Sequence, residues 1–419
     1  MDLELSLRKL FSLHNFGIKL GLENTVNFLN YLGNPQNNLK TIHIAGSNGK
    51  GSTASFVSSI LQEYGFRTGL YTSPHFIRFN ERVQINGVQI SNDFIAEFIT
   101  EYEDYIDQNE LTFFEVTTAL AFKYFFESGT DYCVIETGLG GRLDATNVLN
   151  PLSIIITTIS LEHTNILGTT LEQIAAEKAA IIKTNSKVFS GYLKVEAEKI
   201  IEEKCKKTGS DLFKLKNFIK DDSSLIIENN EICFDKINMP LKGKYQKNNA
   251  ALAALAVIKS FDLTDLKTCI KGIENVVKNT GIQGRYEYFH KNPVIIFDSA
   301  HNLDSVEKFT TQFEEESGQY SKIVLLFGVL KDKAIEQMLQ RIKPYFDEVI
   351  LTEIDYERSA KMDELKRICK RNEINAGETT DPAIYIRNFM KRDKSECLVV
   401  FGSIYLLGEV KNKLSIEVT

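Results

Sequence analysis

The chain has 419 residues, of which 43% are hydrophobic and 25% charged, and its formal net charge is −7. The composition is that of a globular protein, and the length exceeds what one hydrophobic core usually organises, so we expect two domains. Acidic and basic residues are intermixed, which argues against a nucleic-acid partner, and no run of about 18 apolar residues is present that would span a membrane.

The start of the chain and its cysteines bear on the cellular compartment. Met1-Asp2-Leu3-Glu4 is acidic and lacks the basic, then apolar, pattern of a secretion signal. The six cysteines are scattered singly, which suits reduced thiols better than disulfides or a zinc site. We therefore expect a cytoplasmic protein, with a monomer as the default state.

Short apolar segments alternate with longer amphipathic segments along the chain. Because most apolar segments are uniformly hydrophobic, we expect mostly parallel strands covered on both faces by helices, which is an α/β fold. In chain order, the predicted strands are Thr41–Ala45, Thr68–Tyr71, Tyr132–Glu136, residues 154–159, Lys187–Ser190, and residues 294–297, 323–327, 348–352 and 398–401.

The pattern also predicts a domain boundary. Residues 279–285 contain few apolar side chains and two glycines, and the alternation of strands and helices resumes at Val294. We therefore divide the chain into residues 1–288 and 289–419. Within the first domain, residues 213–239 have short alternating segments, which predict a small antiparallel insertion.

The first predicted strand is followed directly by Gly46-Ser47-Asn48-Gly49-Lys50-Gly51-Ser52, and an amphipathic helix is predicted at residues 52–64. Glycines let backbone N–H groups point at an anion, and the helix N-terminus favours negative charge. Lys50 would reach the terminal phosphates of ATP, and the hydroxyl of Ser52 or Thr53 would hold Mg²⁺. The loop is two residues shorter than the common NTPase pattern. The alternative is a glycine-rich turn without a ligand, but the flanking strand and helix favour ATP.

The strand Tyr132–Glu136 ends in a carboxylate. The carboxyl ends of parallel strands collect at the ligand crevice, so we expect Glu136 near the phosphate loop as an oxygen ligand for Mg²⁺. A surface glutamate that merely closes a strand is the alternative. The following Thr137-Gly138-Leu139-Gly140-Gly141-Arg142-Leu143-Asp144-Ala145-Thr146-Asn147 contains three glycines and then alternating polar residues, which indicates a shaped binding loop.

Two further residues are ambiguous when taken alone. His163 follows the predicted strand 154–159, where a histidine is usually structural or solvated, and Mg²⁺ prefers oxygen ligands. Lys178 lies on an amphipathic helix predicted at residues 171–183, where a surface lysine is an equally good interpretation.

Together these segments resemble the folylpolyglutamate synthase/dihydrofolate synthase family of the Mur ligase superfamily. The resemblance covers nearly the whole chain in order. The segments that carry it are residues 16–23, 46–52, 71–75, 78–83, 112–115, 136–147, His163 with Leu167-Gly168, residues 177–183, 243–246 with Asn249, Gly284-Arg285, residues 298–302, 327–329 with Asp332-Lys333, and residues 402–406.

The resemblance implies a P-loop-containing Mur-ligase-like ATPase domain with a mostly parallel sheet, followed by a smaller Rossmann-like glutamate-ligase domain. The residues that match ATP contacts are Gly49, Lys50, Gly51, Ser52, Gln246, Asn249, Arg285 and Asp298. The residues that match metal ligands are Ser52, Ser73, Glu136, His163 and Lys178, the last as a carbamylated lysine.

The resemblance also implies where the other substrates bind. The residues on the pteroate or folate side are Ile18, Lys19, Leu20, Gly21, Thr112, Phe113, Phe114, Glu115, Leu143, Asp144 and Ala145. His301 and Ser403 match the glutamate side, and the implied catalytic residues are Lys50, Glu136, His163, Lys178 and His301. Three residues depart from the family pattern, namely Glu162 in place of Asp, Ala180 in place of Gly, and Ser299 in place of Gly.

The implied reaction is the ATP-dependent ligation of L-glutamate to a folate or pteroate carboxylate through an acyl phosphate, with ADP and phosphate as products. The implied cofactors are ATP, two Mg²⁺ ions and a monovalent cation. We favour a bifunctional enzyme that accepts dihydropteroate and tetrahydrofolate polyglutamates. The alternatives are a folylpolyglutamate synthase alone, a cell-wall amino-acid ligase, and a regulatory nucleotide-binding ATPase. The cell-wall ligase would carry an extra N-terminal domain, for which the phosphate loop at residue 46 leaves no room.

Overall fold

The computed structural model describes residues 3–13, 21–221, 223–228 and 230–416. The chain forms two compact units. The first comprises residues up to His75, Phe79–Pro240 and Gln246–Gly281, and the second comprises Ile282–Thr419 with the short segments Phe76–Arg78 and Leu241–Tyr245.

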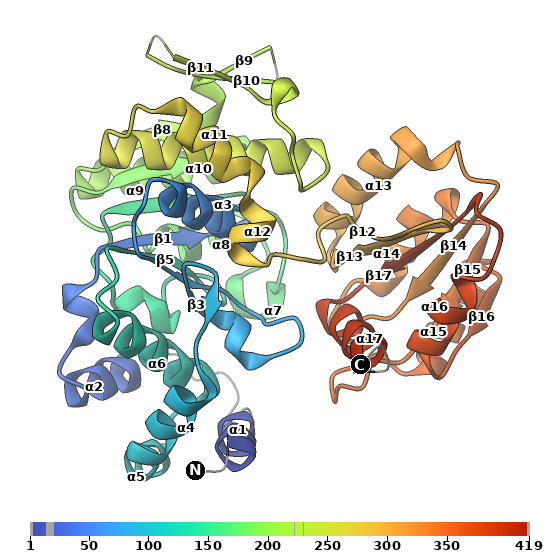
Figure 1. Ribbon diagram of the computed structural model, residues 1–419, viewed down its shortest axis with the longest axis horizontal. Helices are drawn as coiled ribbons and strands as arrows, with labels where there is room; N and C mark the ends of the chain where they lie inside the picture. Colours follow the sequence, from blue (N-terminus) through green and yellow to red (C-terminus); the bar gives the residue numbers. More distant parts are fainter. Residues whose placement is uncertain (1–2, 14–20, 222, 229, 417–419) are drawn as a thin grey trace. The chain divides into compact units, whose positions relative to one another are not determined.

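The first unit is built on an eight-stranded sheet with the order β4-β3-β2-β5-β1-β6-β7-β8 (Figure 1). The run from β2 to β8 is parallel, while β3 and β4 pair antiparallel at one edge. Its strands are β1 (Thr41–Ala45), β2 (Thr68–Tyr71), β3 (Val83–Ile85), β4 (Val88–Gln89), β5 (Tyr132–Glu136), β6 (Ser153–Ile156), β7 (Lys187–Ser190) and β8 (Asp211–Lys214).

Helices cover both faces of this sheet (Figure 1). Successive strand residues point to opposite faces, so Cys133 and Ile135 of β5 join a hydrophobic cluster with Phe122 and Phe125 of α6, while α3 contacts β1, β2 and β5. The helices are α1 (Leu3–Ser12), α2 (Glu23–Tyr31), α3 (Lys50–Glu63), α4 (Asn92–Glu101), α5 (Glu103–Gln108), α6 (Phe113–Glu127), α7 (Thr164–Leu167), α8 (Leu171–Ala179), α9 (Val195–Thr208), α10 (Lys244–Phe261), α11 (Leu266–Glu274) and α12 (Val276–Thr280). The 3-10 turns are η2 (Pro35–Asn38), η3 (Phe79–Arg82), η4 (Ala145–Val148), η5 (Leu215–Asn217) and η6 (Phe234–Lys236).

A separate three-stranded antiparallel sheet lies within residues 213–239. Its strands are β9 (Ile219–Lys220), β10 (Ser224–Ile227) and β11 (Asn230–Cys233), in the order β11-β10-β9. The first residues of the predicted insertion belong elsewhere, because Phe213 lies in β8 and pairs with Phe189 of β7 in the large sheet.

The second unit contains a six-stranded sheet with the order β12-β13-β17-β14-β15-β16, parallel except for the pair β12 and β13. Its strands are β12 (Glu287–Lys291), β13 (Val294–Asp298), β14 (Lys322–Phe327), β15 (Glu348–Leu351), β16 (Ala376–Glu378) and β17 (Glu396–Phe401). The helices are α13 (Leu303–Ser317), α14 (Ile335–Ile342), α15 (Met362–Arg371), α16 (Pro382–Phe389) and α17 (Ile404–Ile416), with a 3-10 turn η7 (Lys343–Tyr345). One core cluster holds Phe309 and Met338, and a second, on the other face, holds Ile386 and Leu406.

The predicted α/β fold class is confirmed, with local differences. The second unit begins at Ile282 rather than at residue 289, because β12 is the edge strand of its sheet. Strand β6 ends at Ile156, since the residues after it turn toward the loop that follows β1 and bond to it. Helix α8 ends at Ala179, where the hydrogen bonds shorten to the i to i+3 type.

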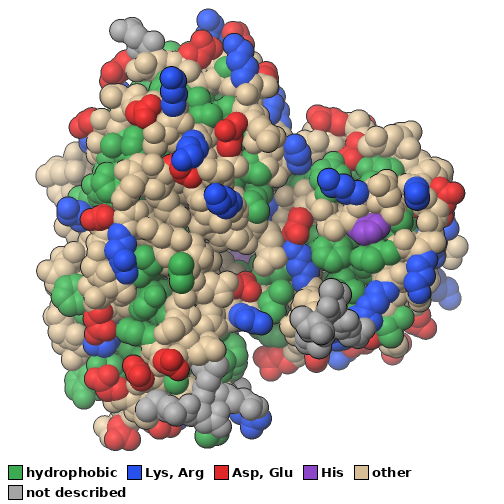
Figure 2. Space-filling view, in the orientation of Figure 1, with side chains coloured by type: hydrophobic (Ala, Val, Ile, Leu, Met, Phe, Trp, Pro, Cys, Tyr) green, Lys and Arg blue, Asp and Glu red, His purple; other side chains and the backbone are tan. Residues whose placement is uncertain are grey.

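Within the described ranges, the structure holds no helix that is both long and apolar enough to cross a membrane. On the face shown in Figure 2, Lys and Arg side chains are interspersed with Asp and Glu side chains.

Candidate active site

The glycine-rich loop joins the end of β1 to the start of α3. Gly49, the residue before the helix, has a φ of 86°, and a Cβ atom there would lie 2.6 Å from Asn249 Oδ1. Both the positive φ and the close approach require glycine. Ser47 N donates to Thr158 O at 2.7 Å, and Asn48 N donates to Thr158 Oγ1 at 3.1 Å. The loop is therefore fixed against the residues after β6, with the N-terminus of α3 beside it as an anion site.

Polar side chains from α3 and α10 line this loop. Lys50 Nζ donates to Gly46 O at 3.0 Å. Its amine therefore lies at the loop, where it is predicted to bind the phosphates of ATP. Gln246 Nε2 donates to Ser52 Oγ at 3.2 Å, and Asn249 Nδ2 donates to Gln246 Oε1 at 3.0 Å. The structure thus brings together the predicted ATP residues Gly49 to Ser52, Gln246 and Asn249.

Glu136 ends β5, which is the neighbour of β1. Its side chain is only 4% exposed, and its Oε2 accepts a hydrogen bond from Ser73 N at 3.1 Å. Ser73 follows β2, the neighbour of β5 on the other side. Two predicted metal ligands are therefore in contact at the carboxyl ends of adjacent parallel strands.

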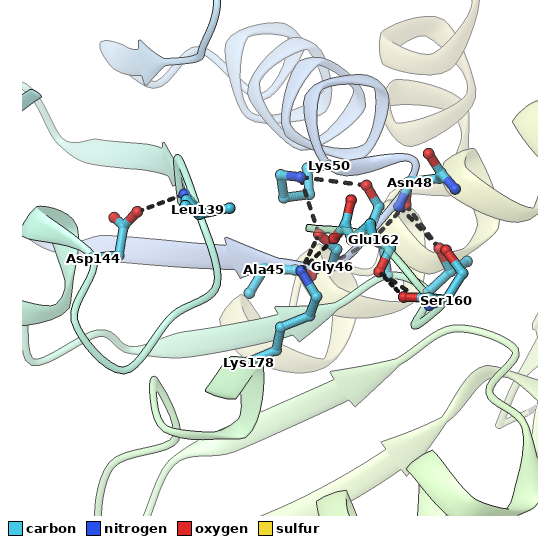
Figure 3. A network of polar contacts seen from close by, with 12 residues as sticks. Ala45, Gly46, Asn48, Lys50, Leu139, Asp144, Ser160, Glu162 and Lys178 are labelled. Atoms are coloured by element: carbon cyan, nitrogen blue, oxygen red, sulfur yellow. Dashed lines mark hydrogen bonds and ion pairs between the residues drawn. The ribbon is translucent and has the colours of Figure 1, made fainter. Parts of the chain in front are cut away.

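Lys178 is fully enclosed, so the interpretation as a surface lysine is wrong. It is 1% exposed, and its Nζ donates to Gly46 O and to Glu162 Oε1, both at 2.8 Å. Figure 3 shows Lys50 and Lys178 reaching Gly46 from α3 and α8, with Glu162 beside them. His163 follows Glu162, has a φ of 44° and is the residue immediately before α7.

Burial and charge act in opposite directions on this buried pair. Burial lowers the pKa of Lys178, and the Lys50 charge acts in the same direction, while Glu162 opposes them. Burial works to raise the pKa of Glu162, but the charges of Lys178 and Lys50 hold that pKa at about 2. The carboxylate is therefore ionised at neutral pH, and the amine is less basic than an ordinary lysine.

The loop after β5 packs on α8. A Cβ atom on Gly141 would lie 2.7 Å from Glu177 O, and Arg142 Nε donates to Glu177 Oε1 at 2.9 Å. Asp144 is buried and accepts from Leu139 N at 2.8 Å, as Figure 3 shows. The predicted substrate residue Asp144 thus organises its own loop. Leu143 and Ala145, which are also predicted to contact the pteroate or folate, are half-buried and buried, respectively.

The predicted substrate segment 112–115 starts α6. Thr112 Oγ1 accepts from Glu115 N at 3.3 Å, and Glu115 Oε2 accepts from Thr112 N at 2.7 Å, which is a capping box. Phe113 is buried and stacks on Phe11 of α1 at 5.9 Å between ring centroids. Phe114 reaches the loop after β5, because a Cβ atom on Gly138 would lie 2.5 Å from its ring.

The remaining residues of the predicted pteroate side are only partly described. Gly21 lies ahead of α2, whereas Ile18, Lys19 and Leu20 fall outside the described residues.

Four predicted site residues lie in the second unit. Asp298 ends β13, and its carboxylate accepts from Tyr286 N and from Ala300 N, both at 2.8 Å. Burial raises the pKa of Asp298 to about 6. Arg285 donates to Ser299 Oγ, and His301 Nδ1 lies 2.9 Å from Ser299 O. The last of the four, Ser403, follows β17, the neighbour of β13.

The buried Ser403 Oγ accepts from Tyr405 N at 3.2 Å. Asp298 and Ser403 therefore both act as acceptors for nearby backbone N–H groups.

The donor set determines which metal would fit. Among the described residues, no group of three or more His, Cys, Asp or Glu side chains is placed to hold a metal ion. The predicted set contains two such residues, Glu136 and His163, and otherwise hydroxyl groups and Lys178. Glu136 and the serine hydroxyls fit Mg²⁺, which usually takes one or two protein carboxylates and completes its shell with phosphate oxygens and water, whereas the nitrogen atoms of His163 and of the Lys178 amine are not the ligands that this ion prefers.

Sequence reasoning overlooked two features of this site. One is the ion pair between Glu162 and Lys178. In the sequence, Glu162 stands out only as a departure from a family pattern. The other is His43, whose imidazole is buried in β1 and lies 2.8 Å from Thr146 Oγ1. A histidine in a short apolar strand was the available signal.

A phosphate-binding loop, buried carboxylates and paired lysines at the carboxyl ends of parallel strands define a nucleotide-binding α/β protein. Comparison with known families agrees: residues 44–257 match the Mur ligase middle domain, and residues 284–404 match the Mur ligase glutamate ligase domain.

Full-length relatives narrow the class. The Bacillus subtilis dihydrofolate synthase/folylpolyglutamate synthase is 32% identical, over 95% of this chain and 96% of the relative. E. coli FolC in complex with DHPP and ADP superposes with a TM-score of 0.88 at 25% identity, over 99% of this chain and 98% of that one. A bifunctional folylpolyglutamate synthase/dihydrofolate synthase with Mn, AMPPNP and L-glutamate bound has a TM-score of 0.85 at 25% identity, with 99% and 98% coverage.

This chain belongs to the folylpolyglutamate synthase/dihydrofolate synthase family of Mur ligases. The predicted family and enzyme class, an ATP-dependent ligase, are confirmed.

Proposed function

We propose that this ligase joins L-glutamate to the carboxylate of both dihydropteroate and reduced folates, and so performs two successive steps with one site. The observation that carries the proposal is the convergence of Lys50 and Lys178 on Gly46 O, beside the buried carboxylate of Glu162. Support comes from the Bacillus subtilis relative, which is named for both activities, and from the relatives solved with DHPP, ADP and L-glutamate.

The chemistry requires activation of a carboxylate. Phosphoryl transfer from ATP to the acceptor carboxylate gives an acyl phosphate and ADP. The α-amine of glutamate, having lost its ammonium proton to solvent, attacks the acyl carbon. The C–N bond forms, the attacking nitrogen releases a second proton, and phosphate leaves as the C–O bond breaks. Lys50 neutralises charge on the transferred phosphoryl group, and the loop after β5 orients the acceptor.

The metal part of the proposal assigns Ser52, Ser73, Glu136, His163 and carbamylated Lys178 to two Mg²⁺ ions, with a monovalent cation as a further component. Bound Mg²⁺ supplies charge neutralisation at the phosphates and at the acceptor carboxylate. The buried contact between Ser73 N and Glu136 Oε2 supports this set, because it holds the carboxylate at the strand end.

Carbamylation requires an uncharged Lys178 amine that can react with CO₂. Burial of this amine and its lowered pKa support the proposal. Protein equilibrated with ¹³C-bicarbonate should show a carbamate carbon signal that disappears in Lys178→Ala. Small carboxylates such as acetate should restore activity to that variant. Absence of the carbamate signal from the wild-type protein would remove Lys178 from the metal set.

Only small molecules are proposed as partners, and the enzyme is proposed to be a cytoplasmic monomer. All six cysteines are unpaired, as a reducing compartment requires. Analytical ultracentrifugation tests the oligomeric state.

The test of function is ADP release by purified protein with Mg-ATP and L-glutamate, comparing dihydropteroate with tetrahydrofolate. Turnover with both acceptors is expected. Turnover with tetrahydrofolate alone would reduce the enzyme to a folylpolyglutamate synthase. Turnover with neither, while ATP still binds, would contradict the proposed substrates.

A further inference from the structure

A histidine lies inside the sheet, three residues before the phosphate loop. His43 is fully buried in β1, and its register partners are Ile135 of β5 and Ile154 of β6. Its Nε2 lies 2.8 Å from Thr146 Oγ1, in the turn that ends the loop after β5. The contact therefore links the central strand to that loop.

The direction of this hydrogen bond follows from its neighbours. Thr146 Oγ1 donates to Asp144 Oδ1 at 2.5 Å, since a carboxylate can only accept. The hydroxyl has one hydrogen and uses it there, so it must accept from His43. The imidazole consequently carries its hydrogen on Nε2. Burial, assisted by the charge of Lys183, lowers the pKa of His43 to about 3, which keeps the ring neutral.

Asp144 extends the connection to both ends of the loop. Its Oδ1 accepts from Thr146 N at 3.1 Å, and its Oδ2 accepts from Leu139 N at 2.8 Å. One carboxylate therefore ties Leu139, near the start of the loop, to Thr146, near its end. His43 donates a hydrogen bond to Thr146, so the loop is also fixed to β1, the strand that leads into the phosphate loop.

A purely structural role explains this histidine poorly. Its Nδ1 has no hydrogen-bond partner among the described residues, and a buried acceptor without a partner destabilises the fold. An aliphatic side chain between Ile135 and Ile154 would avoid that loss. The Nε2 donor to Thr146 is what an aliphatic residue would not supply.

We infer that His43 is a positioning residue that, through Thr146 and Asp144, holds residues 138–147 in the conformation that receives the pteroate or folate acceptor. The acceptor part of this inference rests on the proposed function. The loop-holding part rests on the hydrogen bonds alone.

The test compares His43→Leu with His43→Gln, whose amide can donate in place of Nε2–H. Thr41→Val is the matched control, because Thr41 is on the same strand and face and its buried hydroxyl has no partner among the described residues. In His43→Leu, the acceptor KM should rise about tenfold and the ATP KM should change less than about twofold, because one hydrogen bond at the acceptor loop is lost. His43→Gln should regain most of the acceptor affinity, and Thr41→Val should keep the wild-type KM values.

A second measurement does not depend on the substrate. Amide hydrogen exchange within residues 139–147 should be about tenfold faster in His43→Leu and near wild type in His43→Gln. Unchanged exchange and KM values with only a lower Tm would overturn the inference, as would equal rises in the KM values for ATP and acceptor. If the wild-type enzyme uses neither acceptor, the proposed function fails, and faster exchange then still supports the loop-holding role while unchanged exchange overturns it.

Discussion

Lys178 Nζ and Glu162 Oε1 lie 2.8 Å apart in a buried ion pair, and the same amine donates to the carbonyl oxygen of Gly46. Charged groups are costly to bury, so such a pair depends on both partners. Because Lys50 also donates to Gly46 O, two lysines share one carbonyl oxygen in the phosphate loop. This arrangement gives the first prediction.

In protein kept free of CO₂, so that Lys178 is a free amine, Glu162→Leu should lower the unfolding free energy at pH 7 by about 3 kcal/mol, since it leaves that amine buried without its carboxylate. The pKa of Lys178 is already lowered by burial, and removing Glu162 removes the charge that opposes this. The unfolded state then binds more protons than the folded state at pH values between the folded and the unfolded lysine pKa. The variant's stability should therefore rise with pH from 7 toward 10, as urea unfolding would measure.

The double variant Glu162→Leu/Lys178→Met provides the control. It removes both charges, so it should recover most of the lost free energy and lose the rise with pH. If the single and double variants were equally unstable, the ion pair would not explain the loss.

How far the sequence predicts this site depends on whether the signal is local. The glycine-rich loop and Glu136 are visible because a strand, a turn and a helix follow one another in the chain. The burial of Lys178 is not local, because it depends on the loop at Gly141 packing against α8. The partnership with Glu162 likewise requires two segments, sixteen residues apart, to meet.

The fold shows the same division. Mostly apolar strands such as β14 were predicted from their composition. Strand β12 was missed because none of its residues is fully buried and three of its five side chains, those of Glu287, His290 and Lys291, are charged or polar. Missing β12 displaced the predicted domain boundary. The capping box of Thr112 and Glu115 is a local pattern that sequence reasoning could have recognised.

Gly141→Ala should separate the loop after β5 from α8. The added Cβ atom would lie 2.7 Å from Glu177 O and 3.1 Å from Lys178 Cα, and backbone atoms cannot yield cheaply. We expect a loss of about 1–3 kcal/mol of unfolding free energy from this overpacking. The acceptor KM should rise as well, and steady-state kinetics with thermal unfolding would measure both effects.

Gly318→Ala is the matched control for that substitution. Gly318 follows α13 with a φ of −65°, and a Cβ atom there would meet no atom within 4 Å. Reduced freedom of the unfolded chain should make this variant more stable by about 0.4–1 kcal/mol. An equal loss of stability in both variants would mean that the contact with Glu177 is not the cause.

Asp298→Asn should change how stability depends on pH. Burial raises the pKa of Asp298 to about 6 from 3.8, so the folded state holds its proton more tightly than the unfolded state. Wild-type stability from this group is present below about pH 4 and is lost as pH rises through about 6, by on the order of 3 kcal/mol. The asparagine variant lacks this titration. Urea unfolding of both proteins between pH 4 and 7 should show that the stability of Asp298→Asn increases relative to that of the wild-type protein as the pH rises.

Asp332→Asn is the matched control, because the pKa of Asp332 is shifted in the opposite direction from that of Asp298. Although burial opposes it, the charges of Lys333 and Arg358 lower the pKa of Asp332. Wild-type stability from Asp332 is therefore present above the unfolded pKa and lost as pH falls. The difference between variant and wild type should run in the opposite direction from that of Asp298→Asn, and slopes of the same sign would contradict the assigned causes.

Thr112→Ala should weaken the start of α6. Thr112 Oγ1 accepts from Glu115 N at 3.3 Å and donates to Glu115 Oε2 at 2.8 Å, so alanine removes half of the capping box. The expected loss is about 1–2 kcal/mol of unfolding free energy, measured by urea denaturation. Thr112→Ser, which keeps the hydroxyl, should be close to wild type.

Thr112→Asn distinguishes capping from substrate contact, because asparagine caps a helix as well as serine does but carries no hydroxyl. If Thr112 acts by capping, this variant should regain both the stability and the acceptor KM of the wild-type enzyme. A stable Thr112→Asn protein with an acceptor KM about tenfold higher would instead correspond to the loss of one hydrogen bond to the acceptor. Since the two hydrogen bonds that the structure shows for Thr112 Oγ1 are both made to Glu115, we expect the first result.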